Sequence, residues 1–225
     1  MKRIMQTVVL TAAIAAVLAC GGSGNGGTTS TTADTTALAA KLEADLLTVA
    51  DVGPLWQLGH AVNDADFTDA MQLPCADAAL NPSIAARLLP TAGVQFEPVD
   101  HSNMHLMELA RTGPAARLAT DLDLLREAIE ACTGRHTAGT DAGTVDVAAL
   151  AIPELGDQRF AMLLTGTQAA DAGVTWYVRV ATVRVGTVAI DIRLTEILDT
   201  PSDGPQITDA AFVGIVEQAT SRINR

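Results

Sequence analysis

Residues 176–194, WYVRVATVRVGTVAIDIRL, have the pattern of two β-strands joined by a turn at Gly186. Apolar side chains recur at every second position in both halves, as they do in strands, where successive side chains point to opposite faces of a sheet. Two runs with the same period, residues 145–151 and 160–164, precede them. Turn-forming Gly, Pro and Asp residues separate the runs. The sequence therefore predicts four consecutive strands in an antiparallel meander.

One face of this predicted sheet is apolar and the other is polar. Trp176 and Val178 share the predicted core face. The alternate positions of the last two strands are predicted to share the opposite face, and they carry Thr175, Tyr177, Arg179, Asp191, Arg193 and Thr195. A buried parallel sheet would not permit so many polar side chains on one face, which favours antiparallel pairing.

Helical patterns flank the meander. Apolar residues at a spacing of three to four predict a helix from residue 36 to the Gly53-Pro54 pair, another over 114–133, and a last one from Thr208 to Ile223. Short strands are predicted at 55–62, 94–99 and 104–111, and short helices within 76–90. Helices before and after the sheet, packed on one face of it, give a single α+β domain.

The first 20 residues have the features of an export signal. Lys2 and Arg3 precede an uncharged apolar run, Ile4 to Ala19, which is too short to cross a bilayer. The run ends in Val17-Leu18-Ala19-Cys20, which resembles the bacterial lipobox. We expect residues 1–19 to be a signal peptide and Cys20 to be acylated, which places the protein on the extracytoplasmic face of the cell membrane. The alternative is a secreted protein with a chance cysteine.

Composition divides the mature chain and excludes one class of partner. Residues 20–36 are rich in Gly, Ser and Thr and are predicted to form a flexible tether, followed by a domain at 37–225. Removal of Lys2 and Arg3 changes the formal net charge from −12 to −14. Nucleic acid is excluded as a partner because its phosphates require Lys and Arg clusters. Attachment to the membrane would depend on the acyl chains of Cys20.

Two further cysteines, Cys75 and Cys132, remain in the predicted domain. In an oxidising compartment the simplest prediction for such a pair is a disulfide. The apolar positions of helix 114–133 place Cys132 on its core face, so this bond would hold the helix to the segment around Cys75. Two free buried thiols are the alternative.

Four stretches of the chain resemble the extracellular sensor domain of the mycobacterial PknH receptor kinases and of related actinobacterial lipoproteins. They are the segment Leu46-Leu47-Thr48-x-Ala50-Asp51-Val52-Gly53, the helix end Leu125–Cys132, the hairpin Trp176–Ile192 and the terminal helix Ile215–Ile223. The resemblance spans residues 38–224. It implies an α+β domain with an open cleft beside an antiparallel sheet, a largely unidentified ligand and no catalytic role.

The chain departs from that family in two respects. The kinase sensor domain has a second disulfide, for which this sequence has no cysteines, and this chain has no kinase domain. A protein held in one leaflet would need a partner to carry a signal across the bilayer. The resemblance therefore implies binding more than signalling.

The predicted function is ligand or partner binding without catalysis, metal or cofactor. Tyr177, Arg179 and Arg193 are the candidate ligand-binding residues of the cleft. The ligand would be a small molecule, a lipid or an envelope protein. The alternatives are a carrier of lipid or other hydrophobic envelope molecules, an envelope hydrolase, and a structural partner of another envelope protein.

Other residue groups are weak candidates for chemistry. His101 and His105 have a spacing that suits zinc only on a helix, and they fall on a turn and a strand. Ser102 lacks the Gly-x-Ser-x-Gly context of a hydrolase nucleophile. A last group of carboxylates, as in glycosidases, follows the final strand and is better explained as a polar loop: Glu196, Asp199 and Asp203.

Overall fold

A computed structural model describes residues 31–59, 62, 92–100, 103–137, 143–167, 174–198 and 205–225. The helices in these ranges are α1 (Thr31–Asp45), α2 (Val49–Val52), α5 (Ala115–Ala131) and α6 (Asp209–Ile223). The strands are β1 (Trp56–Leu58), β2 (Ala92–Pro98), β3 (Met104–Thr112), β4 (Gly134–Thr137), β5 (Thr144–Ala149), β6 (Gln158–Thr167), β7 (Thr175–Val185) and β8 (Val188–Leu198).

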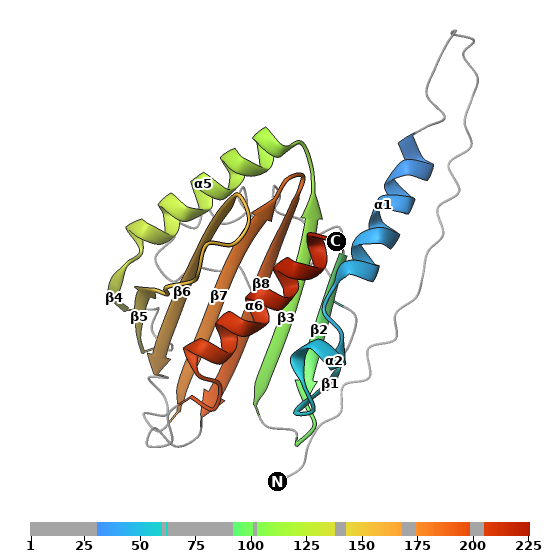
Figure 1. Ribbon diagram of the computed structural model, residues 1–225. Coiled ribbons are helices and arrows are strands. Elements are labelled where there is room, and N and C mark those ends of the chain that lie inside the picture. Colours follow the sequence, from blue (N-terminus) through green and yellow to red (C-terminus); the bar gives the residue numbers. More distant parts are fainter. Residues whose placement is uncertain are drawn as a thin grey trace, which may run out of the picture.

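The strands form one antiparallel sheet in the order β1-β2-β3-β8-β7-β6-β5-β4 (Figure 1). Strands β5 to β8 are neighbours in both the chain and the sheet, so the predicted meander is confirmed. Strand β3 pairs with β8 along its whole length, from Met104 opposite Glu196 to Thr112 opposite Val188. That pairing joins the earlier β1–β3 segment to the meander and makes a single α+β domain, as predicted.

The turn between β7 and β8 fixes which side chains share a face. Val185 pairs with Val188, which leaves a two-residue turn at Gly186 and Thr187, and Gly186 has a φ of 58°. Such a hairpin turn favours glycine because it needs a positive φ. With two residues in the turn, each odd-numbered residue of β7 pairs with an even-numbered residue of β8. The predicted polar face is therefore wrong: its β7 and β8 members lie on opposite faces of the sheet.

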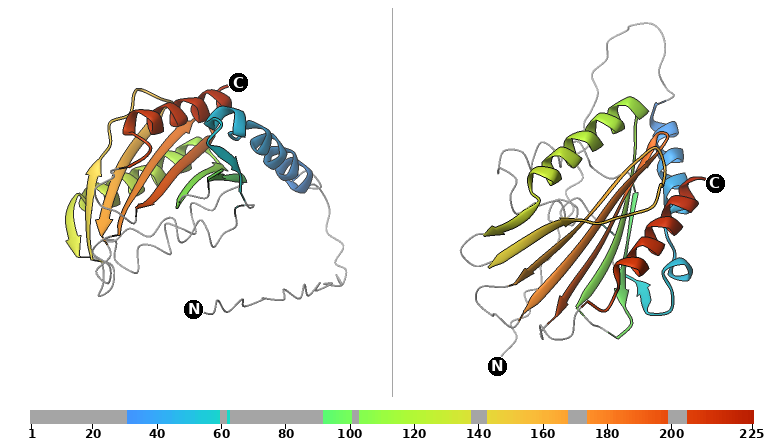
Figure 2. Two further views of the ribbon diagram at one scale, coloured as in Figure 1. Left: turned by 90° about the horizontal axis from the view of Figure 1, so that it is seen from below. Right: turned by 60° about the vertical axis from the view of Figure 1, so that its left-hand side comes forward.

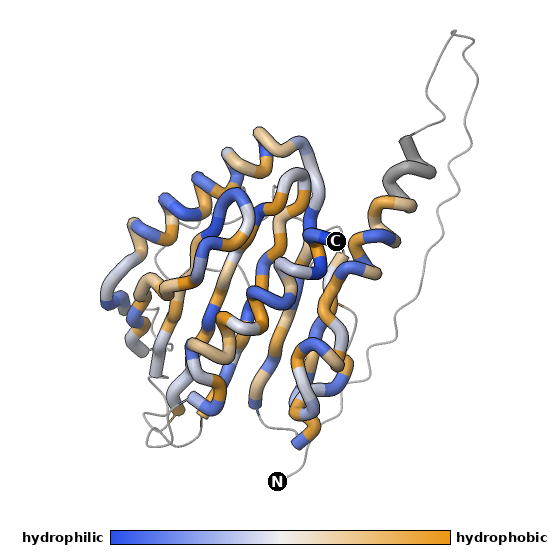
Figure 3. The backbone as a smooth tube through the Cα atoms, in the orientation of Figure 1, coloured by the Kyte–Doolittle hydropathy of each residue, from blue (hydrophilic) through white to orange (hydrophobic). Residues whose placement is uncertain are grey.

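Both faces of the sheet consequently carry apolar side chains, which come from the two sets of alternating positions along the strands. Figure 3 shows apolar and polar residues mixed along the strands. One face, which we call the α6 face, packs Ala181, Val183, Ile190 and Ile192 against Phe212 and Val216 of α6. The opposite face, the α5 face, packs Val178, Val180 and Ala189 against Leu118, Leu122, Leu125 and Ile129 of α5.

The helices therefore cover both faces, and the prediction that they pack on one face is corrected. Figure 2 shows α5 and α6 on opposite sides of the sheet in both of its views. The α1 and α2 helices lie with α6, where Leu42, Leu46 and Leu47 join the same core cluster as Phe212. The physical reason is that both sets of alternate positions of β7 include apolar side chains, with Val178 and Val180 on the α5 face and Ala181 and Val183 on the α6 face.

Local differences from the predicted elements have local causes. The predicted helix over 36–52 is divided into α1 and α2, because Thr48 begins α2 with its N–H donating to the Asp51 carboxylate at 2.8 Å. The α1 helix starts at Thr31, inside the range assigned to the tether. The helix predicted over 114–133 ends at Ala131, and Gly134 starts β4, which the sequence did not predict.

The start of α6 was predicted correctly. Thr208 caps α6, and its hydroxyl oxygen accepts from the Ala211 N–H at 3.2 Å, as predicted. The predicted short helices at 76–90 lie outside the described residues. Among the helices that the structure describes, none combines the length and the apolar composition needed to cross a membrane.

Candidate functional site

The α5 face carries a buried ionic group formed by Arg111, Thr182 and Asp191, which we call the Arg111 cluster. Arg111 lies on β3 opposite Ala189, and Thr182 on β7 lies directly opposite Asp191 on β8. Nη1 of Arg111 donates to Oδ2 of Asp191, and the Thr182 hydroxyl donates to Oδ1 of Asp191 at 2.5 Å. All three residues are at most 5% exposed. A charged pair is therefore buried on the α5 face of the sheet.

The guanidinium of Arg111 is only partly satisfied. Its Nε and Nη2 atoms are buried and have no hydrogen-bond partner. A buried donor without an acceptor costs about 1–3 kcal/mol, and more when the group is charged. Proteins rarely keep such groups, so each one calls for an explanation such as a bound molecule. Two N–H groups on one edge of a guanidinium fit the two oxygens of a carboxylate or phosphate.

Arg193 extends the polar region along the same face. It lies on β8, two residues from Asp191, between Met107 of β3 and Val180 of β7. Its Nε donates to the Thr195 hydroxyl at 3.3 Å. Buried Gln95 follows on β2, directly opposite Met107. The polar residues thus run across β2, β3, β8 and β7.

The structure does not bring the three predicted ligand-binding residues together. Arg193 lies on the α5 face, whereas Tyr177 and Arg179 lie on the α6 face, opposite Glu196 and Leu194 respectively. Arg179 is 1% exposed, and its guanidinium donates to Glu196 at 2.6 Å and to Asp209 at 2.8 Å. The guanidinium of Arg179 is therefore engaged by protein side chains, and its two ion pairs connect the start of α6 to the sheet.

The structure also shows where some of the weaker candidate residues lie. Glu196 accepts two backbone N–H groups, from Gln206 at 2.8 Å and Ile207 at 3.0 Å, besides Arg179. His105 is exposed on β3. In the described part of the chain, no three His, Cys, Asp or Glu side chains are grouped closely enough to hold a metal. The remaining candidates lie outside the described residues: Cys20, Cys75, His101, Ser102, Asp199 and Asp203.

Cys132 is buried in the α5-face core, where it was predicted to point. It ends α5 and packs in the same cluster as Leu125 and Val147. Its bond to Cys75 stays a prediction.

A second site lies at the β1 edge of the sheet, and we call it the edge pocket. It has a volume of about 310 Å³ and lies between the end of α1 and strands β1 and β2. Its lining consists of Glu43, Leu46, Leu47, Leu58, Gly59, Gly93 and Val94. Four aliphatic side chains and two glycines make it an apolar pocket with one acid.

Glu108 lies beside the edge pocket, on the α6 face of β3. It is fully buried and directly opposite Val94, a pocket residue. Its Oε2 accepts the N–H of Leu47, another pocket residue, at 2.6 Å, while its Oε1 is buried without a partner. Burial raises the pKa of Glu108 to about 7, although the Leu47 N–H and the positive charge of Arg222 oppose the rise.

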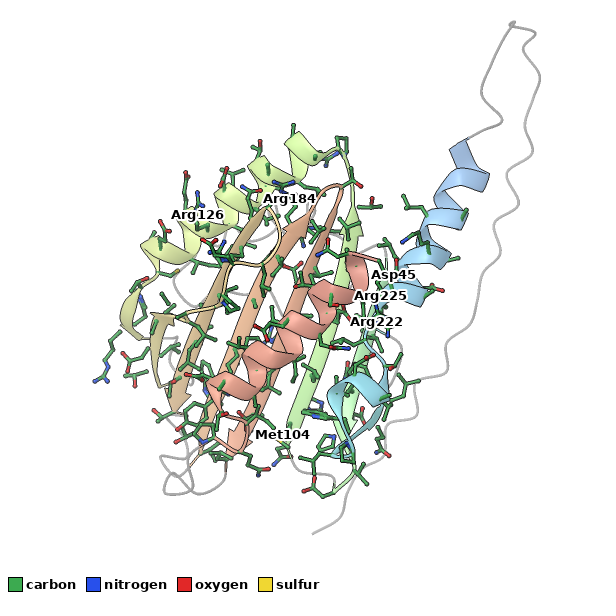
Figure 4. All side chains as sticks on the ribbon, viewed as in Figure 1. Asp45, Met104, Arg126, Arg184, Arg222 and Arg225 are labelled. Carbon is green, nitrogen blue, oxygen red and sulfur yellow. The ribbon has the colours of Figure 1, made fainter. Side chains whose placement is uncertain are left out.

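An ion pair whose charges act on Glu108 joins the three helices of this face. Arg222 of α6 donates to Asp51 of α2 at 3.0 Å and to the backbone oxygens of Ala44 and Asp45 at the end of α1 (Figure 4). Burial raises the pKa of Asp51, but hydrogen bonds from Thr48 and Gln218, together with the charge of Arg222, outweigh it and leave that pKa below its ordinary value. Arg222 is thus engaged by α1 and α2.

Sequence reasoning missed Arg111, Asp191 and Glu108 as site residues. A signal was present in the β3 sequence MHLMELART, where Glu108 and Arg111 interrupt an otherwise largely apolar strand. Charged residues in such a strand are rarely buried without a partner. Their partners are distant in sequence, so the pattern could have marked the residues but not paired them.

Comparisons with known proteins support the fold. No family model and no curated protein sequence matches the chain. Among solved structures, the chain is similar to the extracellular domain of PknH from Mycobacterium tuberculosis, with a TM-score of 0.52 and 15% sequence identity. The match covers 81% of this chain and 94% of that one. At this identity the likeness establishes a shared fold, as the sequence resemblance predicted.

Proposed function

We propose that this chain is a non-catalytic binding domain of the extracytoplasmic envelope, anchored to the cell membrane by acyl chains on Cys20, and that its ligand presents a carboxylate or phosphate to the Arg111 cluster. The single observation that carries the proposal is the pair of buried, unpartnered nitrogens on Arg111. The fold shared with the PknH extracellular domain is consistent with binding outside the cytoplasm.

The donors of the site favour an anion. Asp191 accepts from Nη1 of Arg111, while Nε and Nη2 of the same guanidinium are buried and have no acceptor. The remainder of the mature chain is strongly acidic, so an anion would find few other positive sites to compete. A two-oxygen anion that accepts from both Nε and Nη2 would replace the hydrogen bonds that Arg111 lacks. The ligand is thus expected to be bound through its planar or tetrahedral acid group.

Arg111→Lys is the direct test of this site. Lysine keeps the positive charge beside Asp191 but cannot present two parallel N–H groups. We expect inorganic phosphate or succinate to raise the melting temperature of the wild-type domain by the equivalent of about 1.4 kcal/mol at ten times its Kd. The variant should lose most of that increase. Differential scanning fluorimetry at constant ionic strength measures both.

Arg135→Lys is the matched control for the Arg111 test. Arg135 is exposed on β4 and pairs with exposed Asp146 at 2.7 Å, so its replacement should leave the anion response unchanged. An equal loss in both variants would show general electrostatic binding. No response in the wild type to any anion of this class would refute the proposed site.

Cys20→Ser tests the anchor. Because the acyl chains would be the main attachment of an acidic protein to the membrane, we expect this replacement to move most of the protein from the membrane to the soluble fraction. Ser23→Ala, three residues away, should leave it in the membrane. The experiment uses the full chain in a bacterium that processes lipoproteins, followed by fractionation and intact-mass measurement. A wild-type mass without added lipid would remove the anchor from the proposal.

The Cys75–Cys132 disulfide belongs to the same proposal. It would tie the buried end of α5, beside the α5-face core, to the segment that precedes β2. Closing a 57-residue loop would constrain the unfolded chain by roughly 4 kcal/mol in the loop-entropy model. The envelope-hydrolase alternative has no supporting observation, because Glu196 is held by Arg179 and backbone N–H groups.

A further inference from the structure

We propose that the edge pocket is a second binding site, which takes a small amphiphile whose aliphatic part lies between α1 and β2 and whose primary ammonium group is received by Glu108. This site is separate from the Arg111 cluster, because Glu108 and the pocket lie on the α6 face whereas Arg111 lies on the α5 face. The inference therefore does not depend on the proposed anion site.

The walls of the pocket suit an aliphatic group. Leu46 and Leu47 directly follow α1, Leu58 comes from β1 and Val94 from β2. Leu58 is 67% exposed, the highest value among the large apolar side chains of the described residues. Contact of this kind with water is unfavourable in proportion to the exposed apolar surface, so a bound hydrocarbon would be stabilised there. A volume of about 310 Å³ is at the small end for ligand pockets.

The polar end of the site is Oε1 of Glu108. Its carboxyl group is held in place by the Leu47 N–H at 2.6 Å, which leaves Oε1 buried and without a donor. Glu108 itself is not a lining residue, but Val94, directly opposite it, and Leu47, whose N–H it accepts, both line the pocket. A ligand that enters between these residues would supply the missing hydrogen bond. A buried acceptor without a donor raises the free energy of the folded protein. A ligand that supplies the donor group removes that cost when it binds.

The charges around the pocket favour a cation over an anion. Glu43 of α1 lines the pocket and is exposed at its surface. The charged groups that act on Glu108 from the packed elements are Asp51 of α2 and Arg222 of α6, which pair with each other at 3.0 Å. Its strand neighbours, Val94 on β2 and Ile192 on β8, are uncharged. The net charge that a ligand meets is therefore negative, from Glu43 and Glu108.

The experiment compares octylammonium, octanol and octanoate as probes of equal chain length. Isothermal titration calorimetry at pH 7 is expected to show octylammonium binding at least tenfold more tightly than octanoate, with octanol between them. Repeating the titration in buffers of different ionisation enthalpy should show that protons are released when octylammonium binds, because the ammonium favours the carboxylate form of Glu108.

Leu58→Ser and Leu55→Ser form a matched pair of variants. Both leucines are about equally exposed, at 67% and 63%, but Leu58 lines the pocket and Leu55 is not among its lining residues. We expect Leu58→Ser to weaken octylammonium binding about tenfold and Leu55→Ser to leave it unchanged. Glu108→Gln should remove both the preference for ammonium over alcohol and the proton release. Equal effects of the two leucine variants, or octanoate binding as tightly as octylammonium, would overturn the proposal.

Discussion

Arg179→Met is expected to lower the free energy of unfolding by about 3–5 kcal/mol, the usual cost of breaking a buried ion pair by removing one partner. Arg179 and Glu196 have side chains that are 1% and 0% exposed, and their N–O distance is 2.6 Å. Without Arg179, the Glu196 carboxylate would be buried beside methionine with no counter-charge. Asp209 would also lose its 2.8 Å contact, so the start of α6 should loosen. Urea unfolding followed by circular dichroism measures the change.

A double-mutant cycle separates the ion pair from general damage to the core. Glu196→Gln removes the charge while its amide oxygen can still accept from Gln206 and Ile207. The Arg179→Met, Glu196→Gln double variant should be more stable than the sum of the single changes predicts, by 1 kcal/mol or more. Arg126→Met is the surface control, since its pair with Asp123 is half exposed and should contribute at most about 0.5 kcal/mol. An additive cycle would contradict this account.

Glu108→Gln is expected to stabilise the protein above pH 7 and to have little effect near pH 5. The folded protein raises the pKa of Glu108 from 4.5 to about 7, so between these values the folded state binds the proton more tightly than the unfolded state does. The contribution of protonated Glu108 to the stability of the folded state is fully present below pH 4.5, and it is lost as the pH rises through 7. The full difference corresponds to about 3 kcal/mol. Glutamine resembles the protonated acid and should abolish this loss.

Chemical unfolding of both proteins from pH 5 to pH 8.5 tests the prediction. Glu217→Gln, an exposed change on α6, serves as the control and should follow the wild-type curve. Asp51 should not contribute in this window, because its pKa lies below the ordinary value and it remains ionised throughout. A wild-type and a Glu108→Gln curve with the same slope would show that Glu108 does not titrate as described.

The sheet itself could be predicted because its signals are local. A period of two in residues 145–151, 160–164 and 176–194 identified four strands, and Gly186 identified the last turn, which needs the φ of 58° that glycine allows. Thr208 identified the start of α6. The strand β4 was missed because Gly134 also fits the end of a helix.

The faces could not be predicted from the period alone. Alternation shows which residues of one strand share a face, but it does not show which residues of the next strand join them. That depends on the number of residues in the turn, and a two-residue turn placed Arg179 and Arg193 on opposite faces. The same pairing gave each face a set of apolar side chains, so that α5 covers one face and α6 the other.

The sequence by itself determined the strands, the main helices and the single α+β domain, because each follows from the spacing of apolar residues and from turn or cap residues nearby. The tertiary structure alone decided where charge is buried. Arg111 meets Asp191 across 80 residues of chain, and Glu108 meets the Leu47 N–H across 61. Such pairs depend on strand order and helix placement, and the desolvation that alters their chemistry exists only once distant segments have packed around them.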